Sequence, residues 1–243
     1  MHTYDSNFHR YAANTSYRSA RRITGLVRAL RPIASVLDVG CAYGTWLRAW
    51  QEGGTEDCQG VDGDYVDRLR LEIDPARFAA RDIGRPFDLG RRFDLVESLE
   101  VAEHVPAAAA GIFVDNLVRH GDLILFSAAP PGQGGEFHVN EQPFEYWRDL
   151  FAARDYVGID CIRGPIAGDA EVSPWYRYNC FVYARRDVFA GFDQSVRRHQ
   201  LPANGPILDP APALYKLRRA IVRRLPRAVV NALSRIVARR HAR

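Results

Sequence analysis

The chain has 243 residues, of which 47% are hydrophobic and 26% are charged. This length fits one large domain or a domain with an appendage, and the composition excludes a disordered chain and a polytopic membrane protein. No apolar run reaches the roughly 20 residues that span a bilayer. Residues 1–5 lack the apolar stretch of a secretory signal, so the protein is expected in the cytoplasm.

The four cysteines are too dispersed for a zinc knuckle and too few for a disulfide scaffold. They are expected to be buried, small apolar residues. Their positions are Cys41, Cys58, Cys161 and Cys180.

The formal net charge of +4 hides an uneven distribution of charge. Residues 187–243 contain 12 Lys or Arg and 3 Asp or Glu, whereas residues 1–186 contain 21 and 26. The basic character therefore belongs to the C-terminal segment. Lys216 is the only lysine among the 33 basic residues. Coding composition accounts for this bias, so the arginines are not taken as a sign of nucleic-acid binding.

Hydrophobic spacing predicts a helix followed by an alternating pattern of strands and helices. Apolar residues recur at helical spacing over 14–30, and Pro32 ends the pattern. This helix is expected to cover a sheet edge or the active site. The following alternation predicts a mostly parallel, doubly wound sheet. The strand-like runs are 35–39, 59–61, 93–98, 123–127, 156–162 and 175–184.

No convincing helix separates the last two runs, which predicts an antiparallel pair at one edge of the sheet. Prolines and glycines from Pro202 to Pro212 then indicate a linker. We therefore divide the chain into an N-terminal helical segment (1–32), an α/β domain (33–200) and a basic amphipathic tail (201–243). Within the tail, Pro226 is expected to separate two helices.

The strongest motif is a buried strand that runs into a glycine-containing turn and then a helix, over residues 36–46. Gly40 and Gly44 permit a tight bend and a close approach to a ligand, and Asp38 could orient the turn or accept from an ammonium group. The GxGxxG pattern is absent, which disfavours a pyrophosphate ligand. The alternative is a glycine turn that binds no ligand.

Two further acidic positions follow the next two strands. Asp62 ends the second strand about 20 residues after the glycine turn, a position suited to ribose hydroxyls. Asp82 follows the presumed third strand and could accept from an adenine amino group, while Ile83 packs on the ring. Each acidic residue, taken alone, is more often a turn former or a cap.

In order and spacing these segments resemble the class I S-adenosylmethionine-dependent methyltransferases, across roughly residues 33–186. The resemblance implies a Rossmann-like, seven-stranded sheet whose last strand is antiparallel. One departure is Ala42, where the family commonly has glycine. The expected cofactor-binding residues are Asp38, Gly40, Gly44, Asp62, Asp82, Ile83 and Ser98.

A cluster of carboxylates and histidine follows the fourth strand, at the sheet edge where open α/β folds bind ligands. If a helical turn begins near Glu100, then Glu100, Glu103 and His104 project from one face and could hold a divalent metal. The alternative is that the two glutamates face water or support the turn. A second segment, 132–143, is expected to bring His138 to the same edge, and its glycines would allow a lid to close.

These residues resemble the metal cluster of small-RNA 2′-O-methyltransferases and of some ubiquinone-pathway O-methyltransferases. That resemblance implies Glu100, Glu103, His104 and His138 as ligands, with Mg²⁺ or Mn²⁺ as the expected ions and Co²⁺ or Zn²⁺ also suited to imidazole. The metal would lower the pKa of a substrate hydroxyl. Without metal, His138 or His104 would act as general base. Either route leads to O-methylation.

The segment 138–148 resembles that of bacterial methyltransferases acting on sugars and glycosylated natural products, and its hydrogen-bonding residues Asn140, Glu141 and Gln142 would suit a sugar with vicinal hydroxyls. A saccharide or other small hydroxylated metabolite is therefore the expected substrate, although the aromatic residues Phe144, Tyr146 and Trp147 are more often part of a core. Methylation of RNA ribose is the second hypothesis. It is less well supported, because residues 1–186 are net acidic and would repel the RNA backbone. A cofactor-binding protein without catalysis is the third alternative.

The tail admits two interpretations. Its apolar face could pack on the domain or on a second subunit in a homodimer, which we favour. It could instead attach the protein to the anionic inner face of a membrane.

Overall fold

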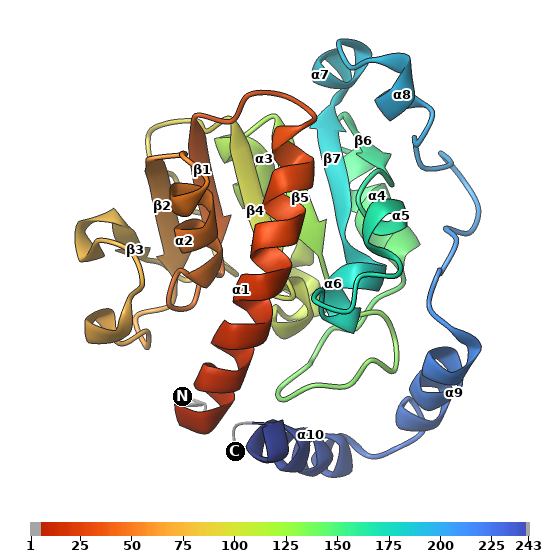
Figure 1. Ribbon diagram of the computed structural model, residues 1–243. Helices are drawn as coiled ribbons and strands as arrows, with labels where there is room; N and C mark the ends of the chain where they lie inside the picture. The colour runs from red at the N-terminus through yellow and green to blue at the C-terminus, as the bar shows by residue number, and fades with distance from the viewer. Residues whose placement is uncertain (1–5, 242–243) are drawn as a thin grey trace.

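The computed structural model describes residues 6–241 (Figure 1). Within this range the chain forms one seven-stranded sheet with the order β3-β2-β1-β4-β5-β7-β6. β7 is antiparallel to both of its neighbours, and the other pairs are parallel. The strands are β1 (Ser35–Val39), β2 (Asp57–Asp62), β3 (Phe78–Ala80), β4 (Leu95–Leu99), β5 (Leu123–Ser127), β6 (Tyr156–Ile159) and β7 (Phe181–Arg185).

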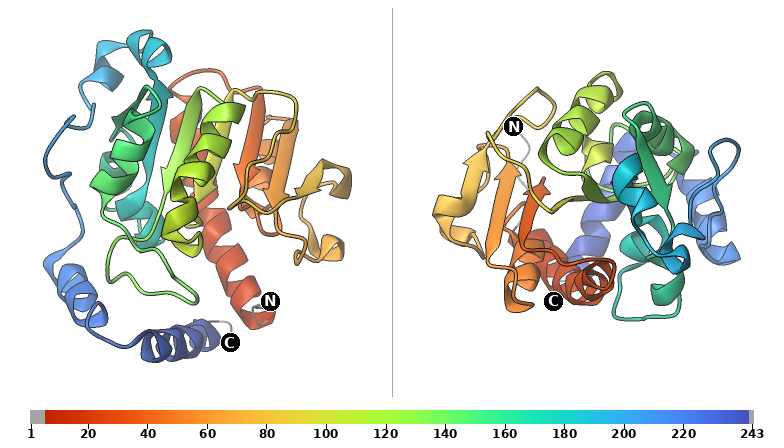
Figure 2. Two further views of the ribbon diagram at one scale, coloured as in Figure 1. Left: turned by 180° about the vertical axis from the view of Figure 1, so that it is seen from behind. Right: turned by 90° about the horizontal axis from the view of Figure 1, so that it is seen from above.

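Helices cover both faces of the sheet (Figure 2). The α-helices are α1 (Ser6–Arg28), α2 (Thr45–Glu52), α3 (Ala110–His120), α4 (Phe144–Ala152), α5 (Arg163–Ile166), α6 (Pro174–Asn179), α7 (Arg186–Ala190), α8 (Gln194–Arg197), α9 (Ala213–Val222) and α10 (Arg227–His241). Short 3₁₀ helices are η1 (Arg68–Arg70), η2 (Pro75–Arg77), η3 (Ala102–His104) and η4 (Ala107–Ala109). This α/β architecture confirms the predicted doubly wound, methyltransferase-like fold.

Two apolar clusters, one on each face, hold the layers together. On one face Ile23 of α1 and Trp50 of α2 are fully buried. On the other face Phe113 of α3 and Phe151 of α4 are fully buried. Fully burying such side chains contributes about 1.5–3 kcal/mol each. The first helix therefore lies across a face of the sheet instead of at its edge.

The predicted strand over 175–184 is wrong in its first half. Pro174 begins helix α6, which ends at Asn179, and only the second half of the run forms β7. The connection that was expected to lack helix holds both α5 and α6. Proline suits the first turn of a helix because its missing N–H would be unpaired there. A short aromatic run does not by itself distinguish a buried helix from a strand.

The last two helices, α9 and α10, lie at the end of the molecule where the parallel strands finish (Figure 1). α10 contacts α1, and the segment before α9 runs along the side of the sheet domain. Near the start of that segment, Leu201 donates its amide to the carbonyl of Gly158 at 2.8 Å, which pairs the open edge of β6. In the described part of the chain, no helix is long and apolar enough to cross a membrane.

Candidate functional site

The glycine turn between β1 and α2 requires its glycines. Gly40 has a φ of +89°, and a Cβ placed there would lie 2.5 Å from both methyl carbons of Val101. Gly44 caps α2 in the left-handed conformation, with a φ of 84°. The turn therefore fits closely against the loop that follows β4, and only glycine permits this approach.

Asp62 at the end of β2 fixes the same turn. Its carboxylate accepts hydrogen bonds from the amides of Ala42 and Gly63, both at 2.7 Å, and from the Tyr65 hydroxyl at 2.5 Å. The bond to Ala42 holds that residue at a φ of 48°, where the related enzymes commonly place glycine. Burial raises the pKa of Asp62, and these three donors oppose the shift.

Two other predicted cofactor residues are buried beneath the turn. Desolvation raises the pKa of Asp38 well above its usual value, and the nearby carboxylates of Glu97 and Asp62 add to the shift. Ser98 is fully buried, and its hydroxyl donates to the carbonyl of Val39 at 2.7 Å. Ser98 therefore supports the end of β1 and has no surface open to a ligand.

Asp82 and Ile83 follow β3 as the sequence predicts. Asp82 is exposed and accepts from the amide of Gly84 at 3.0 Å, and it lies 3.2 Å from the Arg85 guanidinium. Ile83 is partly buried against the second core cluster. These contacts are those of a turn-forming aspartate, and the adenine role of Asp82 and Ile83 stays a prediction.

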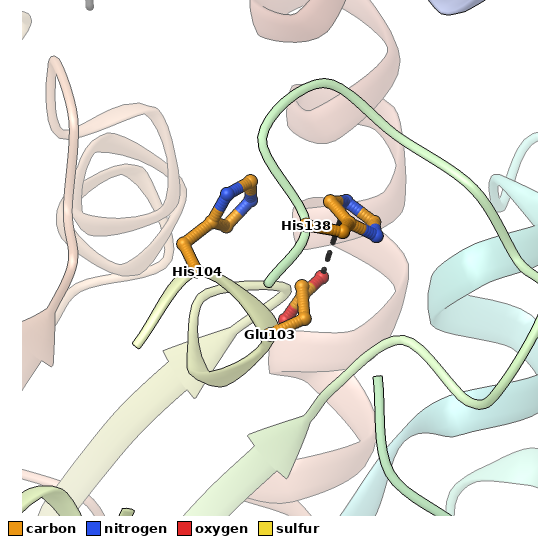
Figure 3. Close-up of side chains that lie close together, drawn as sticks. All are labelled: Glu103, His104 and His138. Atoms are coloured by element: carbon orange, nitrogen blue, oxygen red, sulfur yellow. Dashed lines mark ion pairs between the residues drawn. The ribbon is translucent and has the colours of Figure 1, made fainter. Parts of the chain in front are cut away.

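The structure brings three of the four predicted metal ligands together. Glu103, His104 and His138 each offer a ligand atom, and these atoms all lie within 4.8 Å of one another (Figure 3). Nε2 of His138 is 4.0 Å from Oε1 of Glu103. The rings of His104 and His138 are perpendicular, with centroids 4.9 Å apart.

Glu103 connects the two segments that form this cluster. Its carbonyl accepts from the amides of Val139 and Asn140 at 2.9 and 3.0 Å, which fixes the loop carrying His138. Its side chain is 1% exposed, and no side chain of the described residues donates a hydrogen bond to either carboxylate oxygen. Burial and the neighbouring Glu100 raise its pKa well above the usual value, and the backbone amides of Glu103 and Ala129 partly oppose the shift. A buried carboxylate with so few donors is suited to a ligand.

Glu100 lies outside this group, and the predicted helical turn starting near it is wrong. The turn is a 3₁₀ helix that begins at Ala102, whereas Glu100 has a left-handed backbone with a φ of 57°. The Glu100 carboxylate accepts from Gln133 Nε2 at 2.5 Å and from Asn179 Nδ2 at 3.2 Å. It is directed toward α6 and toward the loop 131–143 that follows β5, which we call the glycine loop. Glu100 therefore does not share a face with Glu103 and His104.

The two histidines differ in their surroundings. Burial, with a smaller effect of His138, lowers the pKa of His104 to about 3, so its ring is uncharged near neutral pH. Nδ1 of His138 lies 2.8 Å from Oε1 of Glu141. A carboxylate only accepts, so Nδ1 carries a proton that it donates to Glu141, and Nε2 is the ring nitrogen that faces Glu103.

Glu141 holds the ring of His138, whereas the sequence suggested it only as a hydrogen-bonding residue for a sugar. Besides its contact with His138, it accepts from the amides of Gly132 and Gly134 at 2.7 and 2.8 Å. Burial acts to raise its pKa, but the hydrogen bond from His138 leaves it lowered. The signal available in the sequence was a glutamate three residues after a histidine. Glu97 was also missed: it is buried in β4 and accepts from Trp50 Nε1 at 2.8 Å.

A cavity of about 380 Å³ adjoins His138. The loop 131–143 forms one side, and the C-terminal helices form the other. The residues contributed by the helical side are Val222, Arg223, Leu225, Val230 and Asn231. Phe144 and Trp147 do not line the cavity, because both are buried in the core.

The chain matches a methyltransferase domain family over residues 7–156. No curated protein sequence matches it. Its fold is similar to that of the sugar N-methyltransferase KedS8 from Streptoalloteichus sp. ATCC 53650, with 19% identity and a TM-score of 0.55 over 76% of this chain and 97% of that chain. It is also similar to CalS10, an amino pentose methyltransferase from Micromonospora echinaspora, with 18% identity and a TM-score of 0.55 over 76% and 99% of the two chains.

A third similar structure is the plantazolicin methyltransferase BpumL, with 15% identity and a TM-score of 0.53 over 73% of this chain and 86% of that chain. These structures are similar in fold at low sequence identity, so they support the fold alone. The family match covers more than half of the chain and includes the glycine turn, Asp62 and the Glu103–His104 pair. The chain therefore belongs to the methyltransferase domain family, with the fold of the class I S-adenosylmethionine-dependent methyltransferases.

Proposed function

We propose that this protein transfers the methyl group of S-adenosylmethionine to a hydroxyl of a saccharide or other small hydroxylated metabolite. Methyl transfer follows from the family. The oxygen acceptor rests on one observation: His138, oriented by Glu141, directs Nε2 toward the buried carboxylate of Glu103. An imidazole whose Nδ1 is held by a carboxylate is suited to remove the proton of a hydroxyl through Nε2.

The cofactor would bind over the glycine turn. Gly40 and Gly44 open the backbone for the methionine part, with Asp38 beneath it. Asp62 would accept from the ribose hydroxyls, since a carboxylate has lone pairs beyond those already used by its present donors. Asp82 and Ile83 lie at the end of β3, where the adenine would lie.

The donor set fits a divalent ion. Glu103 supplies unpaired oxygens, and the uncharged His104 and the Nε2 atom of His138 supply nitrogen lone pairs. Three protein ligands leave positions open for substrate, and this mixture suits Mn²⁺ or Zn²⁺ better than Mg²⁺. A bound ion would lower the pKa of the substrate hydroxyl. Glu100 would contribute by fixing Gln133 of the loop instead of binding the ion.

In the route that needs no metal, the chain's own residues perform the proton transfer. Nε2 of His138 takes the proton of the hydroxyl, and the Glu141 carboxylate stabilises the imidazolium that results. The substrate oxygen forms a bond to the methyl carbon as the carbon–sulfur bond of the cofactor breaks. The products are the methyl ether, S-adenosylhomocysteine and one proton.

A polar substrate is supported by the cavity next to His138. Asn140 lines it. The side-chain nitrogen Nδ2 of Asn140 lacks a partner among the described residues, while its side-chain oxygen Oδ1 accepts from Gln142 Nε2 at 2.9 Å. This buried amide lies beside His138 in the wall of the cavity, and polar groups of this kind suit a substrate with neighbouring hydroxyls. The similar structures KedS8 and CalS10 act on a sugar and an amino pentose, which makes saccharides the first class to test.

The second candidate is methylation of an amino sugar on nitrogen. One observation favours it: no side chain of the described residues donates to the buried Glu103 carboxylate, which could hold a substrate ammonium group. The base would then remove a proton from nitrogen, and no ion would be required.

Calorimetric titration tests both candidates. S-adenosylmethionine and S-adenosylhomocysteine are titrated into metal-stripped protein, then again after Mn²⁺ or Mg²⁺ is added, and turnover is measured on paired hydroxyl and amino sugars. We expect cofactor binding, metal binding that Glu103→Gln weakens, and methylated oxygen. His199→Ala is the matched control, because His199 is exposed and distant in sequence from the cluster. Methylated nitrogen alone would contradict the proposal, and absence of cofactor binding would remove both candidates.

A further inference from the structure

The helices α9 and α10 have an inner face that rests on the glycine loop of the site. Nη1 of Arg218 donates to the carbonyl of Gln133 at 2.9 Å, and the amide of Phe137 donates to Oδ1 of Asn231 at 3.2 Å. The contact is close, since a Cβ on Gly132 would lie 2.1 Å from the Arg219 carbonyl. The inner face thus closes one wall of the cavity beside His138.

The opposite face of the same two helices carries large apolar side chains in solvent. These residues recur every three or four positions, which places them on one side of each helix. Their exposed fractions range from 42% to 79%. They are Leu214, Leu217 and Ile221 in α9, and Val229, Leu233 and Ile236 in α10. We call these six residues the outer face.

The segment that carries the outer face is strongly basic. Residues 210–243 contain ten Lys or Arg and no Asp or Glu. Lys216 and Arg224 are exposed, and among the described residues neither side chain has an ion-pair or hydrogen-bond partner. A surface that combines exposed leucines with an excess of positive charge matches a ligand that is both apolar and anionic.

We propose that the outer face binds the surface of a membrane that contains anionic lipids. Anionic headgroups would pair with the basic side chains, while the leucines and isoleucines enter the boundary between headgroups and acyl chains. A second copy of the chain is a poorer occupant, because a symmetric dimer through this face would place two basic segments against each other. RNA offers negative charge but no apolar partner for exposed aliphatic side chains.

This attachment would also bring the site to the membrane. The helices that touch lipid on one side contact Gln133 and Phe137 of the loop on the other, so the loop would lie within one helix layer of the bilayer surface. The inference stands apart from the proposed reaction, because it concerns a face that no catalytic residue shares.

Vesicle cosedimentation of the full chain tests the proposal. Vesicles of phosphatidylcholine alone are compared with vesicles that also contain phosphatidylglycerol. We expect binding to the anionic vesicles that falls about tenfold or more in the triple variant Leu217→Gln/Ile221→Gln/Leu233→Gln, and that also falls in Lys216→Gln/Arg224→Gln and at high salt. Leu69→Gln is the matched control, because Leu69 is 96% exposed and lies between β2 and β3, outside the tail.

Thermal unfolding establishes that each variant is folded before the comparison is made. Equal pelleting of the triple variant and the unmodified protein would overturn the proposal, and so would equal binding to both kinds of vesicle. Sedimentation velocity without lipid gives the other decisive result: a dimer that the triple variant converts to a monomer would assign the outer face to a second copy. The outcome of the vesicle and sedimentation experiments does not depend on methyl transfer. The membrane proposal and the proposed reaction can therefore fail independently of each other.

Discussion

The imidazole ring of His104 meets that of His138 edge to face, with ring centroids 4.9 Å apart. The two residues come from separate loops, one after β4 and one after β5, and the carbonyl of Glu103 fastens those loops together. Two nitrogen ligands at this separation can share one ion with Glu103.

His104→Ala is expected to weaken Mn²⁺ binding about 10- to 100-fold, the range seen when a group that supports a metal site is removed. The measurement is calorimetry on metal-stripped protein, with His199→Ala as control. Unchanged affinity in His104→Ala would show that the three side chains do not act as a ligand set.

Glu141→Ala is expected to lower turnover about 10- to 100-fold, because the ring of His138 loses the carboxylate that fixes its tautomer. Affinity for S-adenosylmethionine is expected to stay the same, since Glu141 contacts the loop and not the glycine turn. A shift in the pH profile of kcat, checked against Glu145→Ala on α4, separates an effect on the base from a general loss of structure. Equal losses in kcat and cofactor affinity would contradict this assignment.

Gly40→Ala is expected to destabilise the fold by about 2–4 kcal/mol and to abolish cofactor binding. The added Cβ meets Val101 at 2.5 Å, and the φ of +89° is unfavourable for alanine. Gly54→Ala is a matched control, because Gly54 has a φ of +97° with no atom near its Cβ position. In urea unfolding, the difference between the two variants measures the contact with Val101. Equal destabilisation would mean that the contact with Val101 adds no cost.

Glu97→Gln is expected to stabilise the protein progressively as the pH rises from 4.5. Burial raises the pKa of Glu97 to about 8, from 4.5 in an unfolded chain. Between these values the folded state holds a proton that the unfolded state has released, so the free energy of unfolding falls by about 1.4 kcal/mol per pH unit. The side-chain amide of the Glu97→Gln variant does not ionise, so this loss of stability with pH disappears. Its oxygen can still accept the hydrogen bond from Trp50 Nε1.

Denaturant unfolding at several pH values measures the effect, with Glu56→Gln as an exposed control. The stability gap between Glu97→Gln and the unmodified protein should widen up to about pH 8 and then become constant. A gap that does not change with pH would show that Glu97 ionises alike in both states.

The sequence predicted the fold best where a short apolar run stands between clear turn signals. The strand bounds 35–39 and 123–127 agree with β1 and β5, and Pro143 and Pro226 precede α4 and α10. It failed at α6, because the aromatic run from Trp175 to Tyr178 has the composition of a buried strand. Cys41, Cys58 and Cys180 are buried as predicted, whereas Cys161 is half-buried.

The site was predictable in part for a different reason. Residues that end parallel strands meet at one edge, so the approach of His138 to Glu103 follows from topology. The direction of Glu100 does not, because it depends on a left-handed backbone and on hydrogen bonds to Gln133 and Asn179, which lie far along the chain. The sequence also did not predict that one side of the tail contacts the loop while the other stays exposed. It shows the spacing of the leucines but not which side of each helix the domain covers.

Lys216 is exposed on α9, between Tyr215, which packs near Tyr178, and Leu217 of the outer face. It is also the chain's single lysine. An amine-reactive fluorophore would therefore label only one side chain, and a pH above about 9 favours it over the α-amino group. Its emission would report directly whether the tail meets water, lipid or protein during turnover.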